Sequence, residues 1–218
     1  MATHHPGEEL LLAYASGSLP EPQALLVATH MALCPSCRLA VEAYEALGGS
    51  LLEALNPEPL SVTSRQQLLG RLPRGATLSA PPALRPPSPS TRPALPEPLR
   101  GYIGGSLDKV AWRRQGSAHE ARLLPNPAGF VTQLLQTRAG GSIPRHTHEG
   151  TELTLVLAGG FSDEVGRYLA GDVAMTDGSI THRPVADADE DCLCLIVRDA
   201  PLRFTGAVGF ILNLLFRH

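Results

Sequence analysis

The stretch from His30 to Cys37 reads HMALCPSC and holds the residue types that bind zinc. His30, Cys34 and Cys37 form a His-x3-Cys-x2-Cys triplet, and imidazole together with thiolate favours Zn²⁺ over Mg²⁺ or Ca²⁺. If the chain is helical into Cys34, the first two side chains lie four apart on one face. Pro35 cannot continue that helix, because it lacks an N–H, but it suits the first position of a new one. The positive end of the second helix would favour both sulfurs as thiolates, the form that a metal needs.

The triplet leaves a tetrahedral zinc one ligand short, and the His4-His5 pair upstream offers the fourth. A closed four-ligand site is structural, whereas an open three-ligand site could be catalytic. We expect closure by His5, with His4 as the alternative. Two other interpretations compete: a pair of buried cysteines beside a histidine, and a redox CPxC site. The redox site needs a strand before its first cysteine, but the stretch Ala24–Leu33 predicts a helix.

A second group of metal-binding residue types follows the pattern Gly140-x5-His146-x-His148-x3-Glu152-x6-Gly159, and His182 comes later. On a strand, His146 and His148 point the same way, and Glu152 follows a short turn. Three histidines and a carboxylate from separate strands could hold Zn²⁺, Mn²⁺, Fe²⁺ or Ni²⁺. The alternative is a surface histidine pair, because His-x-His alone is a common pattern.

Cys192-Leu193-Cys194 places two thiols on one side of a predicted strand. A disulfide between them would be strained, because their Cβ vectors run parallel. If Cys192 and Cys194 face a barrel interior near a metal, they are candidates for oxidation when that metal is disturbed. The alternative, which we slightly favour, is that they are small hydrophobes filling the barrel.

The chain up to Leu72 predicts helices, a small section that a structural metal would help to stabilise. Five leucines exceed what a free-standing bundle needs, which indicates a surface for a partner protein, with internal packing as an equal alternative. They are Leu25, Leu26, Leu51, Leu52 and Leu55. The expected helices are Glu8–Leu19, Glu21–Leu33, Pro35–Leu47 with a stop at Gly48-Gly49, the short apolar piece Ser50–Leu55, and Ser61–Leu72.

A proline-rich linker follows over residues 76–98, because Pro81–Pro98 has eight prolines in eighteen positions and cannot bury a core. From Leu99 on, short strands alternate with glycine and aspartate turns, which predicts an all-β barrel or sandwich. The clearest strands are Val131–Thr137, Leu153–Leu157 and Cys192–Val197, and Phe210–Phe216 fits either a last strand or a docking helix.

The net charge of −3 gives no electrostatic case for nucleic acid as a direct partner. The first residues have no positively charged segment before an apolar core, and no apolar run is long enough to span a bilayer. The four cysteines, arranged as CxxC and CxC, are typical of metal or redox chemistry in a reducing compartment. We therefore expect a soluble cytoplasmic protein without membrane contact.

The order of a helical His…His-x3-Cys-x2-Cys section, a proline-rich linker and a metal-binding β section resembles the ChrR family of zinc-binding anti-sigma factors. The β section resembles the two signature motifs of the cupin superfamily, and the first motif is complete in its key positions. The second motif has Asp177 and Ser179 where proline and glycine are usual, with His182 in register. The resemblance implies an all-α zinc-stapled helical bundle over residues 1–75, the linker over 76–98, and an all-β cupin barrel over 99–218.

In that family the helical domain binds an extracytoplasmic-function sigma factor, and the cupin is implied to sense oxidative stress such as singlet oxygen or organic hydroperoxide. The implied zinc ligands of the helical domain are His5, His30, Cys34 and Cys37. Those of the cupin metal, zinc or another divalent ion, are His146, His148, Glu152 and His182. The competing hypothesis is a metal-dependent cupin enzyme, a dioxygenase or isomerase, with an attached zinc module. We favour the regulator, because only Arg145 and Arg183 accompany the ligands as candidate substrate-binding groups.

Overall fold

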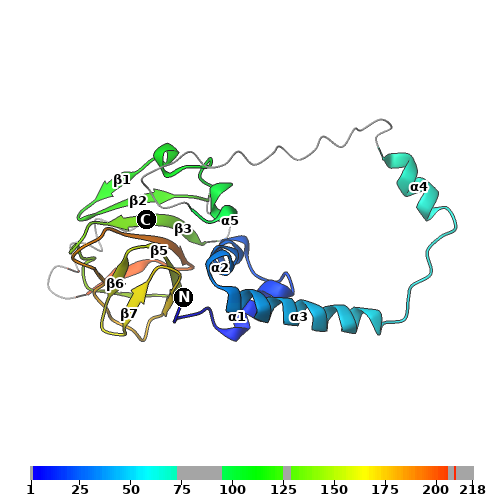
Figure 1. The fold of residues 1–218 in the computed structure, drawn as a ribbon, viewed down its shortest axis with the longest axis horizontal. Helices are drawn as coiled ribbons and strands as arrows, with labels where there is room; N and C mark the ends of the chain where they lie inside the picture. The colour runs from blue at the N-terminus through cyan, green and yellow to red at the C-terminus, as the bar shows by residue number, and fades with distance from the viewer. Residues whose placement is uncertain (1, 73–94, 125–128, 206–208, 210–218) are drawn as a thin grey trace. The chain divides into compact units, whose positions relative to one another are not determined.

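The computed structural model describes residues 2–72, 95–124, 129–205 and 209. Figure 1 shows an α-helical amino-terminal section and a β-rich section. The helices are α1 Glu8–Ala15, α2 Glu21–Leu33, α3 Pro35–Glu53, α4 Ser64–Arg71 and α5 Glu97–Arg100, with a 3₁₀ turn at Leu107–Lys109. The strands are β1 Arg113–Gln115, β2 Ala118–Arg122, β3 Val131–Thr137, β4 His146–His148, β5 Glu152–Ala158, β6 Gly160–Ser162, β7 Arg167–Leu169, β8 Val173–Thr176, β9 Val185–Ala186, β10 Cys192–Arg198 and β11 Leu202–Phe204.

The predicted helices form, but three of them differ in length from the prediction, and α4 covers only Ser64–Arg71 of the predicted Ser61–Leu72. Helix α2 has the predicted bounds, and α1 ends at Ala15, before Gly17 adopts a positive φ of 68°. The predicted stop at Gly48-Gly49 is wrong, because α3 runs through both glycines to Glu53. Neither glycine has a positive φ. Glycine ends a helix by adopting the left-handed conformation, and without that step it only weakens the helix by about 1 kcal/mol.

The strands form antiparallel sheets, which confirms the all-β prediction for the second section. One sheet has the strand order β1-β2-β3-β10-β5-β8, a second has β7-β6-β9, and a third pairs β11 with β4. The register of β10 against β5 shifts between Leu193 and Cys194, which leaves Leu157 of β5 without a partner opposite the CxC stretch. The predicted tail Phe210–Phe216 lies outside the described residues.

Strands β5 and β10 are buried on both faces, which explains why they read as nearly continuous apolar runs. Their two faces belong to different cores because side chains alternate along a strand. One face packs against α2 and α5 through Leu153, Leu155, Leu157, Leu193, Leu195 and Val197. The opposite face lies in the barrel interior and carries Val156, Cys192, Cys194 and Ile196.

Helix α2 belongs to the core on the outer face of the barrel. Leu25 and Leu26 are buried there, so the expectation that they are surplus surface is wrong. Their hydrophobic partners come from β5, β10 and residues around α5, which are distant in sequence. Residues 1–46 and 95–218 accordingly form one compact unit, and residues 47–94 form another.

Leu51, Leu52 and Leu55 are exposed, as expected for a surface that binds a partner. Within the described residues, no helix combines the length and the apolarity that crossing a bilayer would require.

Candidate metal centres

The junction of α2 and α3 brings four predicted ligands together. One donor atom from each of His5, His30, Cys34 and Cys37 lies within 4.8 Å of the others. Nε2 of His30 is 3.2 Å from Sγ of Cys37, and Nδ1 of His5 is 3.4 Å from both sulfurs. Cys34 ends α2 in an extended conformation, and its carbonyl oxygen accepts a hydrogen bond from the N–H of Arg38 in α3.

The adjacent residues His4 and His5 direct their rings towards different parts of the molecule. The ring of His4 packs on Tyr168 with centroids 4.7 Å apart, and its Nδ1 is 3.5 Å from Oδ2 of Asp172. The ring of His5 faces the sulfurs instead. The geometry therefore favours His5 over His4 as the fourth ligand.

The protonation of these residues suits a soft divalent cation. Nδ1 of His30 is 2.9 Å from the carbonyl oxygen of Gly171, which can only accept, so Nδ1 carries the proton and Nε2 offers its lone pair to the cluster. Burial lowers the pKa of His30 and keeps its ring neutral. A neutral imidazole is the form that ligates a metal.

The two thiols of the cluster differ in the direction in which their pKa values are shifted. Burial acts to raise the pKa of Cys34, but hydrogen bonds involving Ser36 and Cys37 hold it below its usual value. Burial and the neighbouring Cys34 sulfur raise the pKa of Cys37 to about 11. In the bare cluster the thiolate form is therefore favoured at Cys34 and disfavoured at Cys37, since a second anion beside the first would be repelled. A bound Zn²⁺ would remove that penalty, so two thiols and two imidazoles fit zinc.

The barrel interior holds a second group, formed by His146, His148 and His182, which are all buried and have donor atoms within 4.8 Å of one another. His146 and His148 lie on β4 and point into the barrel, as the two-residue spacing predicts. His182 is brought alongside by a backbone bridge to His146, with both N···O distances 3.0 Å.

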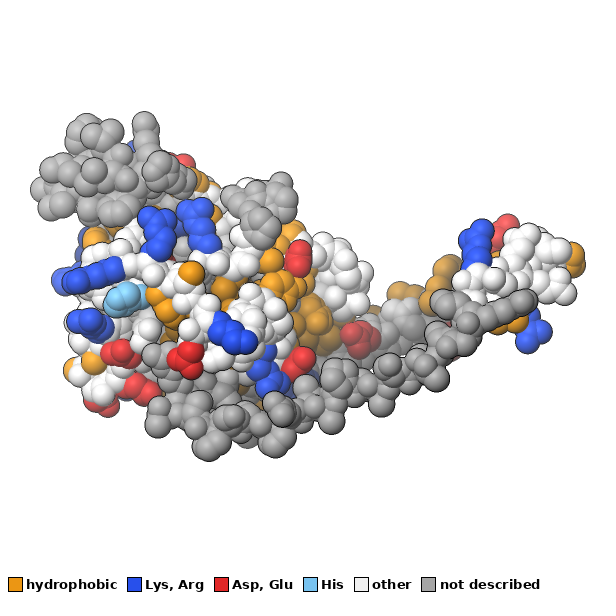
Figure 2. Space-filling model, turned by 90° about the horizontal axis from the view of Figure 1, so that it is seen from above, with side chains coloured by type: hydrophobic (Ala, Val, Ile, Leu, Met, Phe, Trp, Pro, Cys, Tyr) orange, Lys and Arg blue, Asp and Glu red, His pale blue; other side chains and the backbone are white. Residues whose placement is uncertain are grey.

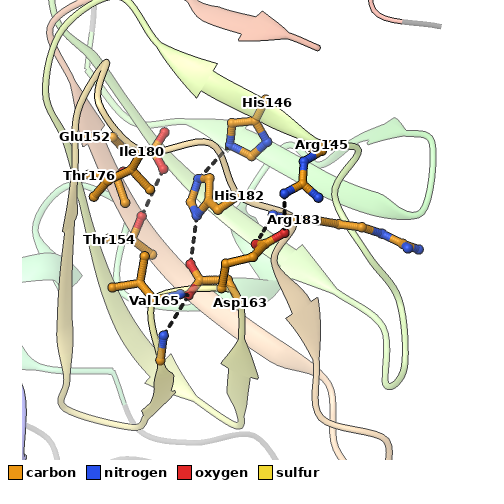
Figure 3. Close-up of polar contacts among 12 residues, drawn as sticks. Arg145, His146, Glu152, Thr154, Asp163, Val165, Thr176, Ile180, His182 and Arg183 are labelled. Carbon is orange, nitrogen blue, oxygen red and sulfur yellow. Dashed lines mark hydrogen bonds and ion pairs between the residues drawn. The ribbon is translucent and has the colours of Figure 1, made fainter. Parts of the chain in front are cut away.

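The ring nitrogens of this group converge in an arrangement that suits a cation. Nε2 of His182 lies 3.1 Å from Nε2 of both other histidines. Nδ1 of His146 is bonded to the Pro144 carbonyl oxygen at 2.8 Å. Nδ1 of His182 is bonded to Oδ2 of Asp163 at 2.7 Å, as Figure 3 shows. Both protons therefore reside on Nδ1, and the two Nε2 lone pairs face each other.

Such facing lone pairs repel unless a cation or proton lies between them. Burial lowers the pKa of His146 to about 4 and that of His148 to about 3, so a proton is disfavoured near neutral pH. The buried Nδ1 of His148 has no hydrogen-bond partner in the described chain. The donor set therefore fits a borderline divalent ion, as expected from the sequence.

Glu152, the fourth predicted ligand of this site, is buried at the start of β5. Its Oε1 accepts a hydrogen bond from the Thr154 hydroxyl at 3.2 Å, and its Oε2 is 3.8 Å from Nδ1 of His148 (Figure 3 shows Glu152 beside Thr154). Burial raises its pKa. The structure thus places Glu152 next to the three histidines but outside the group whose donor atoms converge within 4.8 Å.

Cys192 and Cys194 lie on β10 with their sulfurs 3.5 Å apart, inside the apolar cluster of the barrel. The hydrogen bond to Cys192 and burial raise the pKa of Cys194 well above its usual value. A thiol with a raised pKa is a poor nucleophile. This environment fits the hydrophobic packing interpretation, and redox chemistry stays a prediction.

Sequence reasoning did not single out two carboxylates that orient these sites. Asp163 holds His182 from nineteen positions away, and Asp172 contacts the amino-terminal segment across most of the chain. The sequence around Asp172 indicated only a turn, at Ala170-Gly171-Asp172. No spacing rule links residues so far apart, so only the fold reveals their roles.

Both the helical section and the β-rich section are similar to known proteins, and one relative matches the two together. Residues 102–201 match the family described as the ChrR cupin-like domain, and residues 8–38 match a putative zinc-finger family. Anti-sigma-E factor ChrR of Cereibacter sphaeroides is 40% identical over 216 residues, covering 98% of each chain. The crystal structure of Rhodobacter sphaeroides SigE in complex with the anti-sigma ChrR matches with a TM-score of 0.75 at 38% identity, covering 91% of this chain and 100% of that one.

The relative is a regulator by name, which agrees with the expectation that this chain is not an enzyme. The similarity extends over the helical section and the barrel alike. Both metal-binding patterns thus lie in one chain of the same organisation as the relative. The chain belongs to the ChrR family of anti-sigma factors.

Proposed function

We propose that this chain is an anti-sigma factor that binds and inhibits an extracytoplasmic-function sigma factor through its helical section. The relative of known structure was crystallised with SigE, and this chain shares 38% identity with that structure over most of its length. Zn²⁺ held by His5, His30, Cys34 and Cys37 would fix the α2–α3 junction and so the direction of α3. We further propose domain boundaries at 1–75, 76–98 and 99–218 and a cytoplasmic location.

The observation that carries the proposal is the exposure of leucines on α3 and just beyond it. Leu51, Leu52 and Leu55 are 63%, 70% and 66% exposed. Figure 2 shows hydrophobic side chains reaching the surface along this part of the chain. Further exposed apolar side chains on α3, α4 and the segment between them are Leu39, Leu47, Leu60, Val62, Leu68, Leu69 and Leu72. A series of exposed leucines on successive elements is typical of a surface that binds another protein.

The test is co-purification of the full chain with its cognate sigma factor. Burial of one leucine stabilises a complex by about 1.5–3 kcal/mol, so Leu51→Asp and Leu52→Asp should each weaken binding at least about 10-fold. Val165→Asp is the matched control, because Val165 is 53% exposed but lies on the barrel section. The proposal is refuted if the leucine variants bind the sigma factor as tightly as the control.

We propose that the barrel is the sensor, and that its metal is held by His146, His148 and His182 with Glu152 adjacent. Oxidative stress, by singlet oxygen or organic hydroperoxide, would alter this site and favour release of the sigma factor. The metal is zinc, manganese, iron or nickel, and the neighbouring Cys192-x-Cys194 pair is the candidate for oxidation. Release needs a state that disfavours the inhibitory complex by roughly a few kcal/mol.

Substitution of the barrel histidines tests the sensor. His146→Ala with His148→Ala should leave sigma-factor binding intact and abolish release, read from a sigma-dependent reporter after exposure to singlet oxygen or to an organic hydroperoxide. Metal content of the purified chain, before and after the substitutions, identifies the ion. A double variant that releases the sigma factor like wild type would rule out this site as the sensor.

A further inference from the structure

The turn between β7 and β8, residues 170–172, contacts the amino-terminal segment that carries a predicted zinc ligand. Asp172 is 2% exposed, and Oδ1 of its carboxylate accepts hydrogen bonds from the N–H groups of Thr3 at 2.6 Å and His4 at 3.0 Å. Its Oδ2 accepts from the N–H of Leu169 at 2.9 Å, which fixes the carboxylate within its own turn. Charge-assisted hydrogen bonds of this kind are stronger than neutral ones.

Two further contacts complete the attachment. The N–H of Val173 donates to the carbonyl oxygen of His4 at 3.0 Å, and the His4 ring packs on Tyr168 of β7. Strand β8 is an edge of its sheet, so the amino-terminal segment also covers one of its unpaired N–H groups. The backbone just before His5 is thus bonded to the barrel through the N–H groups of Thr3 and His4 and through the carbonyl oxygen of His4.

The same turn orients the other histidine of the cluster. The carbonyl oxygen of Gly171 lies 2.9 Å from Nδ1 of His30. Gly171 has a φ of 97°, which a residue with a Cβ adopts only under strain. The α2–α3 junction therefore supplies the two sulfurs, whereas the barrel turn contacts the His30 imidazole and the backbone of the two residues that precede His5.

We propose that Asp172 is a positioning residue that holds His5 in the amino-terminal cluster, so that the barrel helps to set the geometry of a zinc site whose ligands all come from the amino-terminal section. This inference rests on the proposed zinc binding of that cluster. Strand β8 runs from this turn to Thr176 in four residues, and the Thr176 hydroxyl is 3.1 Å from Nε2 of His148. One short strand therefore connects the residue that positions His5 with the histidines in the barrel.

The test is a double-substitution cycle on the full chain, with zinc affinity measured by competition against a chromophoric chelator. Loss of groups that orient metal ligands lowers metal affinity about 10–100-fold, so Asp172→Ala should weaken zinc binding by that factor. If Asp172 acts through His5, it should add nothing, within about 2-fold, in the His5→Ala background. The Co²⁺-loaded chain gives a second readout, since Asp172→Ala and His5→Ala should shift its absorption bands alike.

Two variants control for a general effect on folding. Asp191→Ala removes a carboxylate that also accepts a backbone hydrogen bond, from Ala139 at 2.9 Å, but lies away from the cluster, and it should leave zinc affinity unchanged. Thr3→Pro removes the backbone N–H that donates to the Asp172 carboxylate and changes no residue of the barrel. It should weaken zinc binding about 3–10-fold.

The inference is overturned if Asp172→Ala and Thr3→Pro leave zinc affinity within 2-fold of wild type. It is also overturned if the effects of Asp172→Ala and His5→Ala multiply, because Asp172 would then act independently of His5. A wild-type chain that binds no zinc in the amino-terminal section would instead refute the proposed zinc site itself. The two failures are therefore distinguishable in the same titration.

Discussion

Leu26→Ala should separate the two roles that leucines play in the helical section. Leu26 is 0% exposed on α2 and belongs to the core formed with the outer faces of β5 and β10. Leu52, on α3, is 70% exposed. The substitution removes the same atoms in each case, so the difference in outcome reports only the surroundings.

The expected magnitude follows from burial. A buried leucine replaced by alanine loses about 2–5 kcal/mol of unfolding free energy, because transfer and cavity costs add. Taking about 3 kcal/mol, and a shift of about 2–4 °C per kcal/mol for a chain of this size, Tm should fall by roughly 6–12 °C. Leu52→Ala should change stability by less than about 0.5 kcal/mol, as expected for an exposed site.

The assay is thermal and urea unfolding followed by circular dichroism, at one fixed free zinc concentration, because a ligand bound to the folded state raises Tm. Sigma-factor affinity of both variants completes the measurement. Leu52→Ala should weaken binding, whereas Leu26→Ala should do so only near its own unfolding transition.

The packing of α2 on the barrel would be refuted by a Leu26→Ala variant that loses less than about 1 kcal/mol. Two separate unfolding transitions, of which Leu26→Ala shifts only the helical one, would refute it as well. In that case the helical section would fold without the barrel core, and its stability would depend on zinc and its own contacts.

Two further predictions concern the barrel site. Asp163→Asn should weaken its metal binding about 10–100-fold, since the Asp163 carboxylate orients Nδ1 of His182, and metal titration of the variant against Asp191→Asn checks this. In the metal-free chain, the lowered pKa values of His146 and His148 mean that the unfolded state binds more protons below about pH 6.5. Stability should therefore fall by a few kcal/mol as the pH drops from 6.5 towards 4, and bound metal should suppress the fall. Urea unfolding at pH 7.5 and 5 measures it, and an equal loss in a variant lacking both histidines would contradict the assignment.

Local spacing in the sequence was enough to predict most of the residues that the structure brings together in both candidate sites. His30 and Cys34 are one helical turn apart, and Pro35 begins the next helix, so their proximity follows from backbone geometry alone. His146 and His148 share one face of β4 because side chains on a strand alternate. The resemblance to a known family rested on these same short patterns and was confirmed over 98% of the chain.

Tertiary structure decided what spacing leaves open. Leu25 and Leu26 look no different in sequence from Leu51 and Leu52, but the first pair meets the barrel and the second meets solvent. Burial depends on which elements pack together, and the partners of Leu25 and Leu26 on β3, β5 and β10 lie more than a hundred residues away. The choice of His5 over His4 has the same origin, because Asp172, far along the chain, holds His4 and leaves the His5 ring facing the sulfurs. A sequence pattern of period two or 3.6 determines contacts within an element, whereas contacts between distant elements exist only once the core has formed.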